Sequence, residues 1–205
     1  GITVVPYHVH FGTEDYRDRI DLSPAEFYRK LVNGSVFPTT GVPGPGEFTQ
    51  AFDRLAEETD EIITIVVSSK LTASLDSALQ GAEMRKNKKC RVEVIDSLNA
   101  VMAQGFLAIL AVEEAREGKN LDQVAEAVRK ALPKVHMRAC FDTLEYLRRG
   151  GRIGRAAAFL GSLLKVNPII TLKDGQVEPA GRERNRVKAI ENLYNHASSF
   201  KGRIR

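Results

Sequence analysis

The chain has 205 residues, of which 43% are hydrophobic and 27% charged, a balance typical of a globular protein with one or two domains. The net charge is only +4, because 30 Lys and Arg residues are largely offset by 26 Asp and Glu residues. This small excess argues against a dedicated nucleic-acid-binding protein, and the longest apolar-rich stretch, 98–112, is too short and mixed to span a membrane.

The first half of the chain alternates between strand and helix patterns. Apolar runs predict strands at 2–11, 61–68 and 91–95. Apolar residues at helical spacing predict helices at 23–34, 48–55, 71–84, 97–117 and 120–132. Ser23, Pro24 and Glu26 form a helix start with a capping box. Three Pro and three Gly predict a loop at 37–46.

The second half has a different pattern. A strand is predicted at 135–141, and helices at 143–147, 156–164 and 187–200. Two strand patterns, 167–173 and 176–180, flank Asp174-Gly175, a typical two-residue hairpin turn. We therefore predict an α/β protein with two domains. The first, 1–134, contains a largely parallel sheet, and the second, 135–205, contains the hairpin.

Hydroxyl side chains gather where a buried strand meets a helix, at 68–74. Free N–H groups at a helix start favour an anion, and Ser68, Ser69, Thr72 and Ser74 add further donors. The alternative is ordinary capping of the helix by one of these hydroxyls.

A second hydroxyl pair, Thr39-Thr40, lies in the loop rich in Pro and Gly. Such a loop holds side chains in place at low entropic cost, although it is also typical of a simple connection between two elements. Together, Thr39-Thr40 and the hydroxyl side chains at 68–74 predict a site that holds a carboxylate or a phosphate with neutral donors.

Two further clusters allow two interpretations each. Four arginines lie around Gly150-Gly151, between 148 and 155. Such a cluster can bind an anion, or it can be a solvated basic surface. His8 and His10 share one face of a predicted strand, as metal ligands do, but no Cys or carboxylate nearby in sequence completes a set. We therefore expect the two histidines to lie on the surface and no metal to be bound.

The absence of several motifs narrows the range of possible functions. The sequence has neither a GxxxxGK[ST] nucleotide loop nor a GxSxG nucleophile motif. Its two cysteines, Cys90 and Cys140, form no CxxC pair, and the first residues do not form a signal peptide. We therefore expect a cytoplasmic protein. The residues alone indicate an anion site built from hydroxyls but do not name the ligand.

Five segments, in order, resemble motifs of the DegV family. FPTTGVP at 37–43 resembles its PTTSQP loop, and IVVSSKLTASLDSA at 65–78 resembles its ISSxLSGTYQSA segment. VIDS at 94–97 resembles the end of a family strand. DTLEYLRRGGRIG at 142–154 and LGSLLKVNPII at 160–170 are similar to its DTLEYLxxGGRIG and LGSLLxIKPIL segments. The resemblance covers essentially the whole chain.

This resemblance implies a protein that is not an enzyme and needs no cofactor. It implies that one long-chain fatty acid lies in an apolar cleft between two domains, with its carboxylate presented to a separate fatty-acid kinase. By motif, Thr40 and Thr72 would hold the carboxylate, with Thr39, Ser68 and Ser69 beside them. The resemblance also implies basic contacts for the kinase at Arg152, Arg182 and Arg184.

The sequence departs from the family at several points. Counterparts of the family's opening strand and of its closing His-containing loop are missing, so we expect an incomplete family member. Gly41-Val42 replaces Ser-Gln, and Ala73 replaces Gly. Two other functions are alternatives: a phosphotransferase-like enzyme related to the dihydroxyacetone kinases, and a nucleic-acid-binding regulator.

Overall fold

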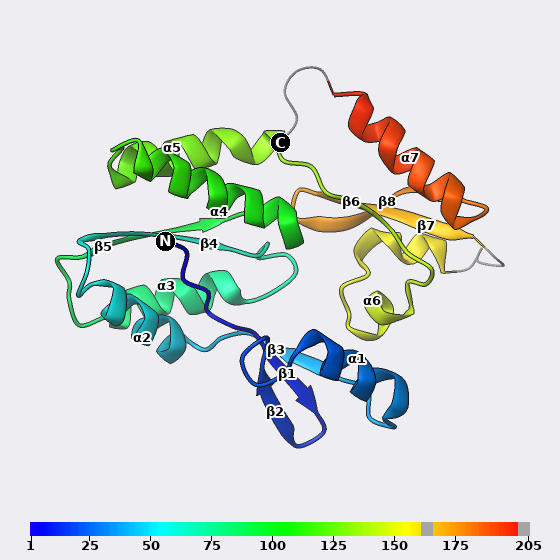
Figure 1. The fold of residues 1–205 in the computed structure, drawn as a ribbon, viewed down its shortest axis with the longest axis horizontal. Helices are drawn as coiled ribbons and strands as arrows, with labels where there is room; N and C mark the ends of the chain where they lie inside the picture. The colour runs from blue at the N-terminus through cyan, green and yellow to red at the C-terminus, as the bar shows by residue number, and fades with distance from the viewer. Residues whose placement is uncertain (161–165, 201–205) are drawn as a thin grey trace.

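The computed structural model describes residues 1–160 and 166–200 (Figure 1). The strands are β1 (His8–Phe11), β2 (Glu14–Arg17), β3 (Thr39–Gly41), β4 (Glu61–Val66), β5 (Arg91–Asp96), β6 (Arg138–Cys140), β7 (Asn167–Lys173) and β8 (Gln176–Glu183). The α-helices are α1 (Pro24–Asn33), α2 (Pro45–Leu55), α3 (Ser74–Met84), α4 (Val101–Arg116), α5 (Leu121–Ala131), α6 (Glu145–Arg149) and α7 (Arg186–Ser198). Two 3₁₀ helices are η1 (Leu132–Lys134) and η2 (Gly154–Phe159).

The parallel strands β4 and β5 lie between two layers of helices, with α2 and α3 on one side and α4 and α5 on the other (Figure 1). Side chains of β4 alternate between these layers, as expected for a strand buried on both faces. Ile62 and Val66 pack in a core with α2 and α3, whereas Ile63 and Ile65 pack against the core formed with α4 and α5. The continuous apolar run of β4 is therefore explained by its two buried faces.

A separate antiparallel sheet, ordered β2-β1-β3, carries α1 (Figure 1). The predicted strand 2–11 is too long, because only His8–Phe11 pairs with other strands. The strand β2 was not predicted, since its EDYR sequence lacks apolar alternation. The predicted loop 37–46 was also partly wrong: three of its residues form β3, which pairs with β1.

Helix starts that have a local capping signal were predicted correctly. Ser23 and Glu26 form the capping box of α1, and Asn120 caps α5 in the same way. The helix predicted from residue 97 instead begins at Val101. Ser97 and Asn99 hydrogen-bond each other's backbone, and such local bonds compete with helix formation.

The third sheet, β6-β7-β8, is antiparallel, with α7 packed against it. Asp174 (φ 50°) and Gly175 (φ 81°) form the two-residue turn between β7 and β8, as predicted. Gly154–Phe159 forms a 3₁₀ helix, so the α-helix predicted at 156–164 is wrong at its start. Residues 161–164 of that helix, which include most of the LGSLL motif, lie outside the described residues.

The turn of this hairpin contacts the first half of the molecule. The hydroxyl of Ser68, which is fully buried, donates a hydrogen bond to the carbonyl of Gly175 at 2.8 Å. Parallel and antiparallel sheets thus occur in one α/β fold, which confirms the predicted fold class. Across residues 1–160 and 166–200, none of the helices has the length and apolar character needed to cross a membrane.

The close packing at Gly175 leads to a stability prediction. A Cβ there would lie 2.4 Å from the Ser68 hydroxyl oxygen, and the backbone has a positive φ. We expect Gly175→Ala to lower the free energy of unfolding by roughly 2–4 kcal/mol, because the clash adds to about 1 kcal/mol of backbone strain. Gly118→Ala is the matched control: it has φ +85° and open space around it. If urea denaturation gave equal losses of unfolding free energy for the two variants, the contact between Gly175 and Ser68 would not contribute to stability.

Candidate functional site

The loop between β4 and α3 is held in shape by buried and charged groups. Ser68 also accepts a hydrogen bond from the Lys70 N–H at 3.2 Å, and its single O–H donor is already used for Gly175. The carboxylate of Asp96 accepts hydrogen bonds from the N–H groups of Ser69 and Leu98, at 3.2 and 2.9 Å. Ser69 itself is exposed. The geometry therefore gives Ser68 a connecting role and leaves the Ser69 hydroxyl on the surface.

Three hydroxyls meet at the start of α3, and we call Tyr7, Thr72 and Ser74 the hydroxyl cluster. The Tyr7 hydroxyl donates to Thr72 Oγ1 at 3.1 Å, and Thr72 donates to Ser74 Oγ at 2.8 Å. Tyr7 and Ser74 are also in direct contact. Three O–H groups in three mutual contacts form a closed ring of donors. Because hydroxyl hydrogens rotate, an anion can take a hydrogen bond from this ring.

The backbone at this point adds to the attraction for an anion. Thr72 Oγ1 accepts a hydrogen bond from the Ser74 N–H at 3.0 Å, and α3 has no side-chain cap at Ala73. The first turn of an α-helix carries a partial positive charge. Helix and hydroxyls thus favour a negative group at the same place, and a carboxylate held by Thr72 stays a prediction.

Thr39 and Thr40 lie on β3 and are both exposed. Neither hydroxyl makes a hydrogen bond with any other described residue, so both are available to a ligand. Thr40 lies opposite Val9 of β1, the strand that directly follows Tyr7. Within the described residues, no hydrogen bond joins Thr40 to Thr72. Their joint action on one carboxylate stays a prediction.

The three predicted basic residues lie in two places. Arg152 is exposed, and its Nε donates to the carbonyl of Leu71 at 3.2 Å, directly beside Thr72. Arg182 and Arg184 lie at the end of β8 and just after it. Seven residues separate Arg182 from Gly175, which corresponds to roughly 20 Å along a strand. Only Arg152 therefore shares the neighbourhood of the hydroxyl cluster.

Tyr7 and Ser74 of the hydroxyl cluster line an apolar cleft of about 870 Å³. Its walls come from the first residues of the chain, α2, β4 and α4; they include Val5, Phe48, Phe52, Ile63, Ala108 and Val112. Gln104 in the wall donates to the carbonyl of Ile65 at 2.9 Å and so satisfies one backbone group. Apolar walls that also present hydroxyl donors suit an alkyl chain that carries an acid group.

Sequence reasoning missed Tyr7. It is 65 residues from Thr72, and no local pattern connects the two. The surroundings of His8 also differ from the expectation, because the sequence showed no carboxylate near it. Asp15 and Glu47 do lie close to His8, at 3.0 Å, but they form ion pairs with it. No group of three or more potential ligands that could hold a metal ion occurs in the described part of the chain.

The chain matches the model of a family of uncharacterised proteins, the DegV family, over residues 1–203. A DegV domain-containing protein from Deinococcus radiodurans is 32% identical over 200 residues, which cover 98% of this chain and 70% of the relative.

Solved structures of other proteins are also similar to this chain. A fatty-acid-binding DegV family protein from Thermus thermophilus is 37% identical, with a TM-score of 0.87 over 95% of this chain and 69% of that one. A stearic acid-binding protein from Eubacterium ventriosum is 27% identical, with a TM-score of 0.84 over 95% of this chain and 68% of that one.

The hydroxyl cluster leads to a prediction about stability. Tyr7→Phe removes one hydroxyl from the ring and leaves Ser74, which is only 2% exposed, with one partner fewer. We expect a loss of about 1–2 kcal/mol in the free energy of unfolding, the usual cost of a lost buried hydrogen bond. The control is Tyr28→Phe, because Tyr28 is 62% exposed on α1. If both variants unfold at the same urea concentration, the ring contributes nothing.

Proposed function

The chain belongs to the DegV family, and we propose that it binds one long-chain fatty acid with its carboxylate at the hydroxyl cluster. The observation that carries this proposal is the position of Tyr7 and Ser74, which belong both to the ring of donors and to the wall of an apolar cleft. Relatives in the same family bind fatty acids. A binding protein of this kind needs no catalytic group and no cofactor.

We place the acyl chain in the cleft. All of its lining residues lie within 1–116, so the cleft is part of the first predicted domain and does not run between two domains. Each buried CH₂ contributes about 0.8 kcal/mol, so the acyl chain supplies most of the affinity. The hydroxyls mainly orient the carboxylate, with Thr72 from the ring and Thr40 from β3 as its donors.

The domain boundary at 134/135 is also a proposal. Residues from 137 onward form a core of their own around Leu144 and Ile170, and Leu71 of the first part packs against it. Leu71 directly precedes Thr72. The carboxylate would therefore lie close to the contact between the two proposed domains.

We further propose that the carboxylate is presented to a separate fatty-acid kinase in the cytoplasm. Two features support this arrangement. Thr39 and Thr40 are exposed, so the carboxylate would lie at the surface. The exposed Arg152 lies beside Thr72, where its guanidinium suits an incoming phosphate group.

Replacing both carboxylate donors tests the binding proposal. We expect Thr40→Val with Thr72→Val to weaken binding about tenfold or more, because each lost bond to a charged oxygen costs on the order of 1–3 kcal/mol. Displacement of a fluorescent fatty acid gives the affinity, and native mass spectrometry shows whether the purified protein carries a lipid. Thr13→Val is the control, since Thr13 is exposed. Unchanged affinity in the double variant would contradict the site assignment. Failure of the wild type to bind a fatty acid would contradict the proposed function.

The kinase contact has its own test. We expect Arg152→Ala to lower the rate of fatty-acid phosphorylation by a fatty-acid kinase about tenfold, the usual effect of losing one strong charged contact, while the affinity for the fatty acid stays the same. Arg29→Ala on α1 is a control for loss of positive charge. Equal rates for wild type and the Arg152 variant would show that Arg152 is not part of the kinase contact.

A further inference from the structure

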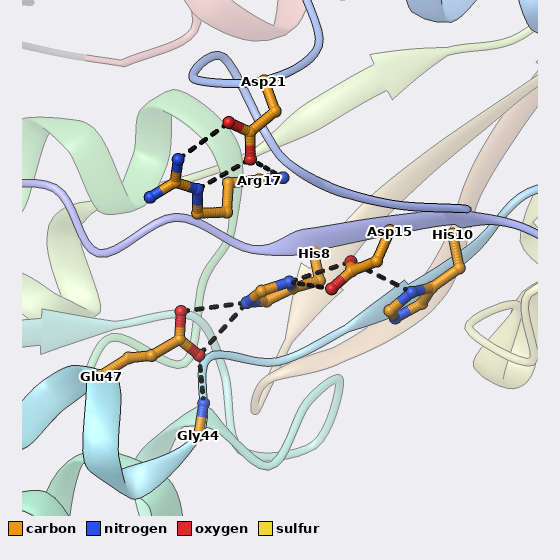
Figure 2. A network of polar contacts seen from close by, with 7 residues as sticks. All are labelled: His8, His10, Asp15, Arg17, Asp21, Gly44 and Glu47. Atoms are coloured by element: carbon orange, nitrogen blue, oxygen red, sulfur yellow. Dashed lines mark hydrogen bonds and ion pairs between the residues drawn. The ribbon is translucent and has the colours of Figure 1, made fainter. Parts of the chain in front are cut away.

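His8 lies between two carboxylates that belong to different elements (Figure 2). Its Nδ1 is 3.0 Å from both oxygens of Asp15 on β2, and its Nε2 is 3.0 and 3.2 Å from the oxygens of Glu47 on α2. A neutral imidazole has only one N–H and can donate to one of these groups. Only the doubly protonated ring satisfies both carboxylates at once.

The surrounding charges favour that doubly protonated form. The hydrogen bond with Glu47 is the largest cause that raises the pKa of His8 above its ordinary value of 6.5; burial opposes it and Asp15 adds to it. His10 on β1 also contacts Asp15, at 3.2 Å between Nδ1 and Oδ1. Asp21 faces the group as well but is paired with Arg17 at 2.7 Å.

The network joins one sheet to a helix in the cleft wall. Asp15 and His8 belong to the antiparallel sheet, whereas Glu47 lies in the first turn of α2 and also accepts a hydrogen bond from the Gly44 N–H at 2.9 Å. Breaking the bond between His8 and Glu47 would remove this charged link and leave Glu47 to cap α2 alone.

The sheet in question carries the proposed carboxylate donor. In the pairing of β1 with β3, His8 lies opposite Gly41, and Val9 lies opposite Thr40. The two strands are packed closely here, since a Cβ on Gly41 would lie 2.8 Å from Nε2 of His10. The position of Thr40 relative to α2 therefore depends on where β1 is held.

We propose that His8 is a positioning residue whose two protons hold β1 and β3, and with them Thr40, against α2. This inference rests on the proposed function. Because protonation strengthens the link, the stabilisation is complete below about pH 6.5, the value for an unperturbed His. It is lost as the pH rises through the raised pKa of folded His8. Affinity for the fatty acid falls over the same range.

The test compares wild type with His8→Gln at about pH 6 and about pH 8.5, on either side of histidine titration. We expect the affinity of the wild type for oleate to fall about tenfold more than that of the variant, as for loss of one charged hydrogen bond. Titration of the oleate carboxyl affects both proteins equally and cancels in the comparison. His136→Gln keeps the wild-type profile, because His136 is exposed and distant from this network.

Hydrogen exchange distinguishes the proposed role of His8 from the proposed binding of a fatty acid. After correction for the intrinsic rate, the amides of Thr39–Gly41 exchange faster at the higher pH in wild type, and equally fast at both pH values in His8→Gln. Glu47→Gln, with Glu57→Gln as its control, lowers the pKa of His8 measured by NMR. A wild type that binds no oleate but shows these exchange rates would overturn the function and keep the link. Identical exchange and pH profiles for wild type and His8→Gln would overturn the link.

Discussion

One buried hydrogen bond joins the first half of the chain to the second. Ser68 and Gly175 are 107 residues apart, and the Ser68 hydroxyl is fully buried, so it needs a partner. That partner is the carbonyl of a two-residue turn whose second residue has no room for a Cβ. The loop that carries Thr72 is thus held against the hairpin, and Arg152 can reach the carbonyl of Leu71 in the same loop.

This arrangement explains why the proposed site uses neutral donors. A carboxylate held by a buried cation would be neutralised in a tight pair, and the desolvation of both charges would offset much of the attraction. Hydroxyls and the first turn of α3 stabilise the charge more weakly, and the cleft supplies the remaining affinity through apolar contact. The arginine beside Thr72 is exposed instead, so its charge stays solvated and within reach of a partner.

The parts of the fold that could be predicted from the sequence are those determined by neighbouring residues. The capping box of Ser23 and Glu26, the Asp174-Gly175 turn and the apolar run of β4 need no information from distant segments. The structures that were missed depend on distant contacts. β2 and β3 are strands because β1 pairs with both, although the sequence of β2 is charged and that of β3 ends in Gly. Residues 2–7 have a strand-like sequence but pair with no strand among the described residues.

The same distinction applies to the site, where burial decides what a hydroxyl does. The hydroxyls after β4 share one local signal, yet Ser68 and Thr72 have different partners. Ser68 donates its only O–H to the hairpin carbonyl, whereas the half-buried Thr72 bonds to Tyr7 and Ser74, two residues that line the cleft. Sequence spacing gives the residue types near a strand end, but only the packing of distant segments determines which partner each hydroxyl meets.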